Sequence, residues 1–110
     1  MNVAGSGTIA VGTGNAQAEF VFRVPESGTR ELIYENPVTG DMVESFDIGA
    51  PILIGTNMAT FSGVCVNMAD PCTFTVTVTG NQAVDRFAIT GSGLTPEAGN
   101  LTSGSIQITP

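Results

Sequence analysis

The chain has 110 residues, which is enough for one domain, 1–110, with one hydrophobic core, and too few for two ordinary domains. Charged residues make up only 12% of it, against about 25% in typical domains, and ten acids against three arginines leave a net charge of −7. Three cations cannot build the basic patch that phosphates require, so the composition excludes nucleic acid as a partner and disfavours anionic lipid.

The start of the chain and its composition give first expectations about location. No apolar run is long enough for a spanning helix, so no membrane insertion is expected. The first residues lack the basic region and apolar stretch of a signal peptide. We therefore expect Met1 to begin a piece excised from a longer protein whose export signal lies upstream. A lysine-free sequence with 14 glycines and 14 threonines is typical of extracellular bacterial or archaeal proteins.

The periodicity along the chain predicts an all-β fold. No segment carries a convincing 3.6-residue apolar period, and Gly, Pro or Asn interrupts the sequence at short intervals. A loop is expected at 91–100, around Pro96. The predicted strands, in chain order, are 7–11, 16–24, 31–35, 41–48, 52–54, 59–65, 72–79, 86–90 and 105–109.

Alternation within these strands predicts which side chains face the core. The inward residues expected in the second and third strands include Phe20, Phe22, Leu32 and Tyr34. In the fourth strand the alternation places Met42, Glu44, Phe46 and Ile48 inward, against Val43, Ser45 and Asp47. An inward Glu44 would need an arginine partner. The alternative is that a bulge or the strand's edge turns Glu44 to solvent.

Short links between eight or nine strands predict an antiparallel, mostly meandering sheet. We expect it to fold into a flattened barrel or a two-layer β-sandwich. Residues 6–9 and 103–106 are alike and are expected to pair at the seam of a closed sheet. Such closure would remove the exposed edges that invite aggregation.

The clearest pattern lies between Ala59 and Gly80, where two strands alternate apolar residues with threonine. If Cys65 faces Cys72, then Gly63 faces Phe74 and the remaining apolar pairs also match, whereas a one-residue slip would oppose them to threonines. Directly opposed residues lie within disulfide reach. We therefore predict a Cys65–Cys72 disulfide and an oxidising, extracytoplasmic location. The alternatives are two reduced core cysteines, or a metal site for which two cysteines without histidine supply only half a tetrahedral set.

Several short motifs follow one another in order along nearly the whole chain. They are Ser6-Gly7-Thr8-Ile9, the Phe20/Phe22 strand, Leu32-x-Tyr34, Ala59 to Cys65, Cys72 to Thr79, Asp85-x-Phe87-x-Ile89 and Gly104 to Ile108. Together they resemble the post-COAP domain family of secreted and cell-surface bacterial and archaeal proteins. The resemblance implies a small all-β module attached to a larger surface or secreted protein, and it carries over no catalytic residue.

The residue types argue against catalysis. Without histidine or lysine the chain has no Ser-His or Ser-Lys nucleophile, no Schiff base and no imidazole ligand. Paired carboxylates could act in principle, but no pair marks a cleft, so we expect no enzyme activity, no catalytic residue and no cofactor. Asp41, Glu44 and Asp47 together, or Asp70 with neighbouring loop carbonyls, could offer oxygens to calcium. The ligand spacing of known calcium loops is absent, and solvated loop acids are the preferred interpretation.

The leading functional expectation is a non-catalytic extracellular accessory module that spaces, presents or binds within a larger protein. Its partners would be adjoining protein domains or a surface assembly. One alternative is a self-assembling structural subunit of a fibre, coat or virion. Another is a carbohydrate- or calcium-dependent ligand-binding domain, although Tyr34, the only aromatic residue with a polar tip, supplies little for sugar stacking.

Overall fold

The computed structural model describes residues 1–110 and consists of nine strands without a helix. No helix long and apolar enough to cross a membrane is therefore present. The strands are β1 (Asn2–Ala10), β2 (Gln17–Val24), β3 (Glu31–Asn36), β4 (Asp41–Ile48), β5 (Ile52–Ile54), β6 (Met58–Asn67), β7 (Asp70–Thr79), β8 (Arg86–Ser92) and β9 (Glu97–Thr109).

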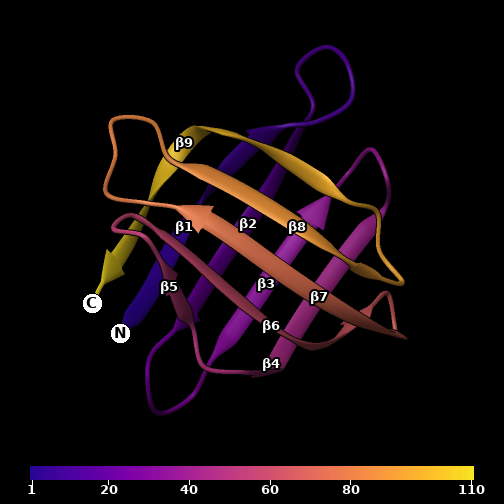
Figure 1. Ribbon diagram of the computed structural model, residues 1–110. Helices are drawn as coiled ribbons and strands as arrows, with labels where there is room; N and C mark the ends of the chain where they lie inside the picture. Colours follow the sequence, from indigo (N-terminus) through magenta and orange to yellow (C-terminus); the bar gives the residue numbers. More distant parts are fainter.

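The sheet closes into a flattened barrel. Its strands follow the order β4-β3-β2-β1-β9-β8-β7-β6-β5, and a further antiparallel pairing of β4 with β6 closes the ring. β5 stays outside the ring and pairs only with β6 (Figure 1). The extents of 34 × 31 × 18 Å show the flattening. The all-β antiparallel prediction is confirmed, and the barrel is the alternative that the chain adopts.

The seam between β1 and β9 forms as predicted, with Ser6 opposite Ser105 and Gly7 opposite Gly104. The strands around it are longer than predicted. β1 begins at Asn2, β8 continues to Ser92 and β9 begins at Glu97, so the loop predicted over 91–100 is present but spans only 93–96. These stretches are rich in Gly, Ser and Thr and show little apolar alternation. Small residues are needed here, because a Cβ on Gly104 would overlap the Ser6 carbonyl oxygen.

Side chains fill the inside of the barrel. Twenty-two buried hydrophobic residues form one cluster, and burial of this kind supplies the main driving force for folding. Its centre is a group of aromatic rings, in which Phe20 stacks on Phe87 with ring centroids 4.2 Å apart and Phe22 lies tilted against Phe61 at 5.2 Å. The inward placement predicted for the second and third strands is confirmed.

The β6–β7 hairpin has the predicted register and the predicted disulfide. Cys65 opposes Cys72 and Gly63 opposes Phe74, and the Cα atoms of the two bridged cysteines lie 4.9 Å apart. Both cysteines are buried. The alternatives of reduced core cysteines and of a cysteine metal site are therefore wrong, and the disulfide indicates an oxidising, extracytoplasmic environment.

The inward placement predicted for Met42, Glu44 and Phe46 is wrong, that of Ile48 is confirmed, and a bulge in β4 explains the difference. Met42, Glu44 and Phe46 are exposed, whereas Val43, Ser45 and Ile48 are buried. The pairing with β6 moves from Glu44–Val66 to Asp47–Val64, so β4 advances three residues while β6 advances two. The extra residue shifts the alternation of the strand by one position. Val43 and Ile48 can therefore both point into the core, although they are separated by an odd number of positions. Glu44 faces solvent, as the alternative interpretation expected.

Candidate functional site

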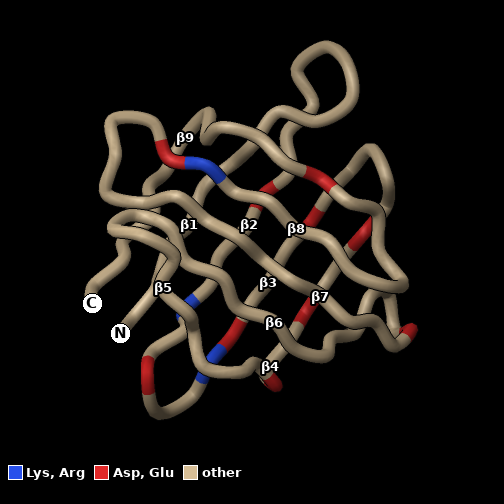
Figure 2. Tube along the Cα trace, in the orientation of Figure 1, with Lys and Arg blue, Asp and Glu red and all other residues tan.

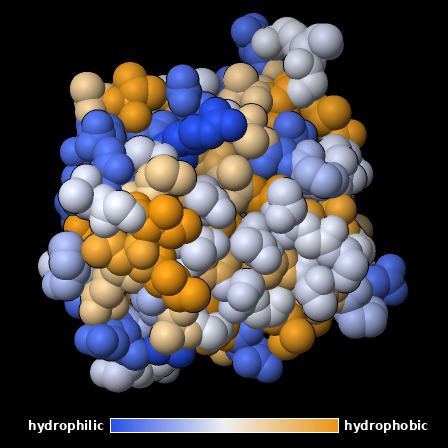
Figure 3. All heavy atoms as spheres, viewed as in Figure 1, coloured by the Kyte–Doolittle hydropathy of each residue, from blue (hydrophilic) through white to orange (hydrophobic).

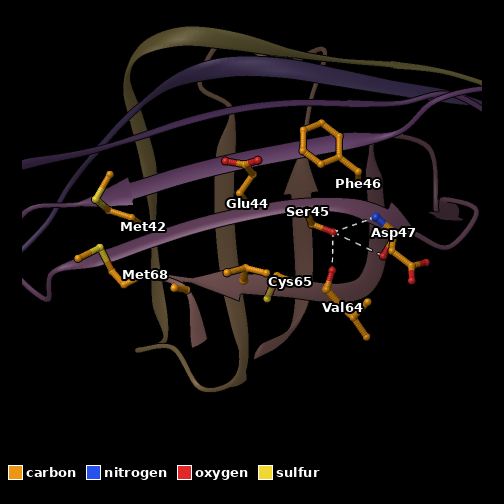
Figure 4. Close-up of a pocket in the computed structure, with 10 residues that line it drawn as sticks. Met42, Glu44, Ser45, Phe46, Asp47, Val64, Cys65 and Met68 are labelled. Atoms are coloured by element: carbon orange, nitrogen blue, oxygen red, sulfur yellow. Dashed lines mark hydrogen bonds between the residues drawn. The ribbon is translucent and has the colours of Figure 1, made fainter. Parts of the chain in front are cut away.

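The most extensive hollow in the molecule lies outside the barrel, on the outer face of β4 and β6. It has a volume of about 640 Å³. We call it the β4–β6 groove (Figure 4). It is lined by Met42, Glu44, Ser45, Phe46, Asp47, Val64, Cys65, Val66, Met68 and Ala69. Seven of these ten residues are hydrophobic, so the groove offers apolar contact rather than a polar reaction centre.

The β4 bulge shapes one wall of the groove. Its polar backbone groups are satisfied by Ser45, whose hydroxyl donates to the Val64 carbonyl at 2.5 Å and accepts from the Asp47 amide at 3.3 Å. Figure 4 shows both bonds near Phe46: the bond to Val64 joins β4 to β6, and the bond from Asp47 stays within β4. Gly63 lets the bulge approach, because a Cβ there would overlap the Asp47 carbonyl oxygen. The bulge therefore holds Phe46 outward on a fixed backbone.

A tight turn closes the other end of the groove. Met68 and Ala69 connect β6 to β7 with φ angles of 51° and 74°, the left-handed values that a two-residue hairpin of type I′ requires. Glycine and asparagine are the usual residues in such a turn, and Met and Ala adopt it with strain. The Met68 amide donates to the Met42 carbonyl at 3.2 Å, which brings the two methionines together at one end of the groove (Figure 4).

A hydrogen-bond network centred on Asn67 fixes the base of this turn. The Asn67 side chain donates to Asp41 and to the Gly93 carbonyl, both at 2.8 Å, and accepts from the Met42 amide at 2.9 Å. Burial opposes ionisation of Asp41, but hydrogen bonds from the side chains of Asn67 and Thr39 and from Thr95 outweigh it and hold the pKa of Asp41 below its ordinary value. Asp41 therefore acts as a charged structural anchor.

The acids at the groove have no cationic partner in the chain. The only ion pair joins the amino terminus to Glu26, at 3.0 Å. Arg30 is used elsewhere, since its guanidinium donates to the carbonyls of Pro25, Glu26 and Ile48. Figure 2 shows acidic residues on β2, β3 and β4 and none along β6. The groove thus combines an apolar floor with unpaired carboxylates from Glu44 and Asp47 on the β4 side.

The acids considered for calcium do not come together. Asp41 is buried and bonded to Asn67, Glu44 and Asp47 lie on the outer face of β4, and Asp70 is exposed beside the hairpin turn. No group of three or more Asp, Glu, Cys or His side chains is placed to hold a metal ion. These acids share no site in this fold.

Tyr34 lies inside the barrel, where it offers no surface for a sugar. The Asn36 amide donates to the Tyr34 hydroxyl and to the Glu97 carboxylate, both at 3.1 Å. Burial raises the pKa of Tyr34 to about 12, the bond from Asn36 lowers it in part, and the negative charges of Glu97 and Asp41 add to the rise. Tyr34, Asn36 and Glu97 thus form a hydrogen-bonded polar cluster at one end of the core.

The sequence-based prediction missed the apolar side chains of the groove. One signal was present: Val64 and Val66 occupy outward positions of the sixth strand, where Thr60 and Ser62 stand at the preceding ones. Valines at two successive outward positions indicate a covered or binding face. The outward Met42 and Phe46 had no such signal, because the bulge that exposes them does not show in the alternation.

Comparison with known proteins adds no relative: no protein family, curated protein or solved structure matches this chain.

Proposed function

We propose that this chain is a non-catalytic accessory module of a larger secreted or cell-surface protein, and that it binds a partner through the outside of its barrel. One contrast carries the proposal. The interior is filled by a 22-residue hydrophobic core, whereas an apolar groove of about 640 Å³ is open on the outer surface. Ligand carriers with a β-barrel fold hold their ligand inside. A packed barrel with an apolar outer groove is suited to binding on its surface.

Two further observations support the extracytoplasmic part of the proposal. The Cys65–Cys72 disulfide suits an oxidising environment. The motif order that resembles the post-COAP family supports a module attached to a surface or secreted protein. No histidine or lysine is available for the common nucleophilic mechanisms, which supports a non-catalytic role.

Fractionation of cells that express the native gene tests this proposal. An antibody raised against the barrel is expected to detect a polypeptide far larger than 11.2 kDa in the medium or surface fraction. A freestanding chain of this mass, or a cytoplasmic location, would overturn it. Antibody pre-absorbed with the purified barrel is the control for specific detection.

A second candidate, a self-assembling structural subunit, is favoured by β5. Its three residues Ile52, Leu53 and Ile54 are all exposed, and its edge away from β6 has no strand partner. Figure 3 shows an apolar group over β5, next to the paler surface over β6 and β7. An unpaired apolar edge is a surface for strand addition. Sedimentation equilibrium decides: concentration-dependent oligomers that Leu53→Lys abolishes would support assembly, and a monomer at all concentrations would reject it.

A further inference from the structure

We propose that the β4–β6 groove receives a segment of a partner protein that carries lysine or arginine beside its apolar side chains. This inference rests on the proposed function, because it takes the groove as the module's binding surface. Three features of the groove support it: the apolar floor, the unpaired carboxylates and the strained turn at the groove's end.

The apolar side chains of the groove form one continuous surface. They are Met42, Phe46, Val64, Val66 and Met68, with 48%, 59%, 51%, 48% and 63% of their surface exposed. Met42 and Phe46 lie on β4, Val64 and Val66 lie on the paired strand β6, and Met68 lies in the turn that follows β6. Contiguous exposed apolar side chains on a small domain mark an interaction site. The two methionines are flexible and polarizable, which suits a surface that adapts to a peptide segment.

The carboxylates define the charge of the occupant. Glu44 lies between Met42 and Phe46 on the outer face of β4, and Asp47 follows at the bulge. A partner that covered these acids with apolar groups alone would leave buried charges without compensation. A lysine or arginine on the partner removes that penalty. This charge complementarity separates a basic apolar segment from a purely apolar one.

The same charges disfavour a second copy of the chain as the occupant. Two molecules meeting through this groove would bring Glu44 and Asp47 of one against those of the other. Each molecule also carries a net charge of −7, and like charges across an interface act against association. The occupant is therefore a different protein.

The strained turn is an independent sign that this end of the groove is used. A type I′ turn is made without strain by Asn-Gly, yet Met68 and Ala69 hold left-handed φ angles of 51° and 74°. Backbone strain of this kind concentrates at functional sites. Here it presents the Met68 side chain, 63% exposed, beside Met42 at the end of the groove.

Titration of the oxidised protein with three designed peptides, followed by amide chemical shifts, tests the proposal. The first peptide carries leucine on one helical face and lysine on the other, the second replaces lysine with glutamate, and the third replaces leucine with serine. We expect the leucine–lysine peptide to shift the amides of β4, β6 and the turn at 68–69. The other two are expected to bind at least about tenfold more weakly.

Matched variants localise the binding. Phe46→Ser is expected to weaken the leucine–lysine peptide roughly tenfold. Glu44→Gln is expected to weaken it roughly two- to fivefold and to reduce its salt dependence. Val84→Ser, at an exposed apolar residue between β7 and β8, is the control and should change nothing. All three positions are exposed, and dispersed amide spectra will show that each variant is folded.

Three outcomes would overturn the proposal: equal binding of all three peptides, shifts outside the groove, or a dimer of the free protein that Phe46→Ser abolishes. The last would make a second copy the occupant. The peptide titration and the fractionation test can fail independently of each other. If the chain is part of a large surface protein but does not bind the leucine–lysine peptide, only the groove proposal is refuted. If the chain is freestanding and cytoplasmic but binds the peptide, only the accessory-module role is refuted.

Discussion

Reduction of the Cys65–Cys72 disulfide offers a direct measure of how the β6–β7 hairpin is stabilised. The two cysteines are separated by 7 positions, so the bridge closes a loop of about eight residues. On the chain-entropy account such a loop lowers the entropy of the unfolded chain enough to stabilise the fold by about 2.5 kcal/mol. Both sulfurs stay in the core after reduction, so this comparison leaves the packing of the side chains nearly unchanged.

Urea unfolding followed by circular dichroism, with and without reductant, measures the difference. For a chain of this size a loss of that magnitude moves the midpoint by roughly 1–2 M urea. The double variant Cys65→Ala/Cys72→Ala has no disulfide, so reductant should leave its urea midpoint unchanged. A difference below about 1 kcal/mol between oxidised and reduced protein would refute the loop-entropy reasoning, because it would mean that the reduced hairpin is already ordered when the rest is unfolded.

Three further measurements test particular contacts. Ala69→Gly should stabilise the protein by about 0.5–1 kcal/mol in urea unfolding, because glycine adopts the φ of 74° without strain; a destabilised variant would contradict the turn assignment. Gly63→Ala should cost about 2–3 kcal/mol, since its Cβ would overlap the Asp47 carbonyl oxygen. Gly49→Ala, whose Cβ would lie 3.6 Å from the nearest atom, should cost less than about 1 kcal/mol, and equal losses would exclude the proposed overlap. Tyr34 is the only tyrosine and the chain has no tryptophan, so near-ultraviolet absorbance should report its pKa of about 12 in the fold, against 10.0 ordinarily. Because the folded pKa is raised, the contribution of Tyr34 to stability should be complete below pH 10 and lost as the pH rises toward 12, and ionisation near 10 in the folded chain would refute this.

The sequence predicts the hairpin register well because two constraints act on it together. Alternation fixes the face of each strand, and the cysteine pair fixes how the strands are aligned. The contact of Cys65 with Cys72 and that of Gly63 with Phe74 follow from this. The similar residues at the two ends of the chain likewise predict the seam of β1 with β9.

Other parts of the fold depend on contacts that no single segment shows. The ends of β1, β8 and β9 are formed by small residues, which let neighbouring backbones approach. Because these residues are not apolar at alternate positions, the sequence shows no strand pattern there. The β4 bulge adds one residue to one strand of a pair, so Val43 and Ile48 both reach the core. Alternation read from Ile48 backward therefore gives the wrong face for Met42 and Phe46. The groove was missed for the same reason, since the bulge creates its apolar wall.

The position of the disulfide around the hairpin turn also affects how the molecule would survive proteolysis. The exposed residues Met68 and Ala69 lie inside the covalent ring that Cys65 and Cys72 close. A protease that cuts the chain there leaves two fragments that remain joined through sulfur and through the β6–β7 pairing. Such a nicked molecule would migrate as one species until it is reduced. At this exposed turn the chain can lose a peptide bond without releasing half of the barrel.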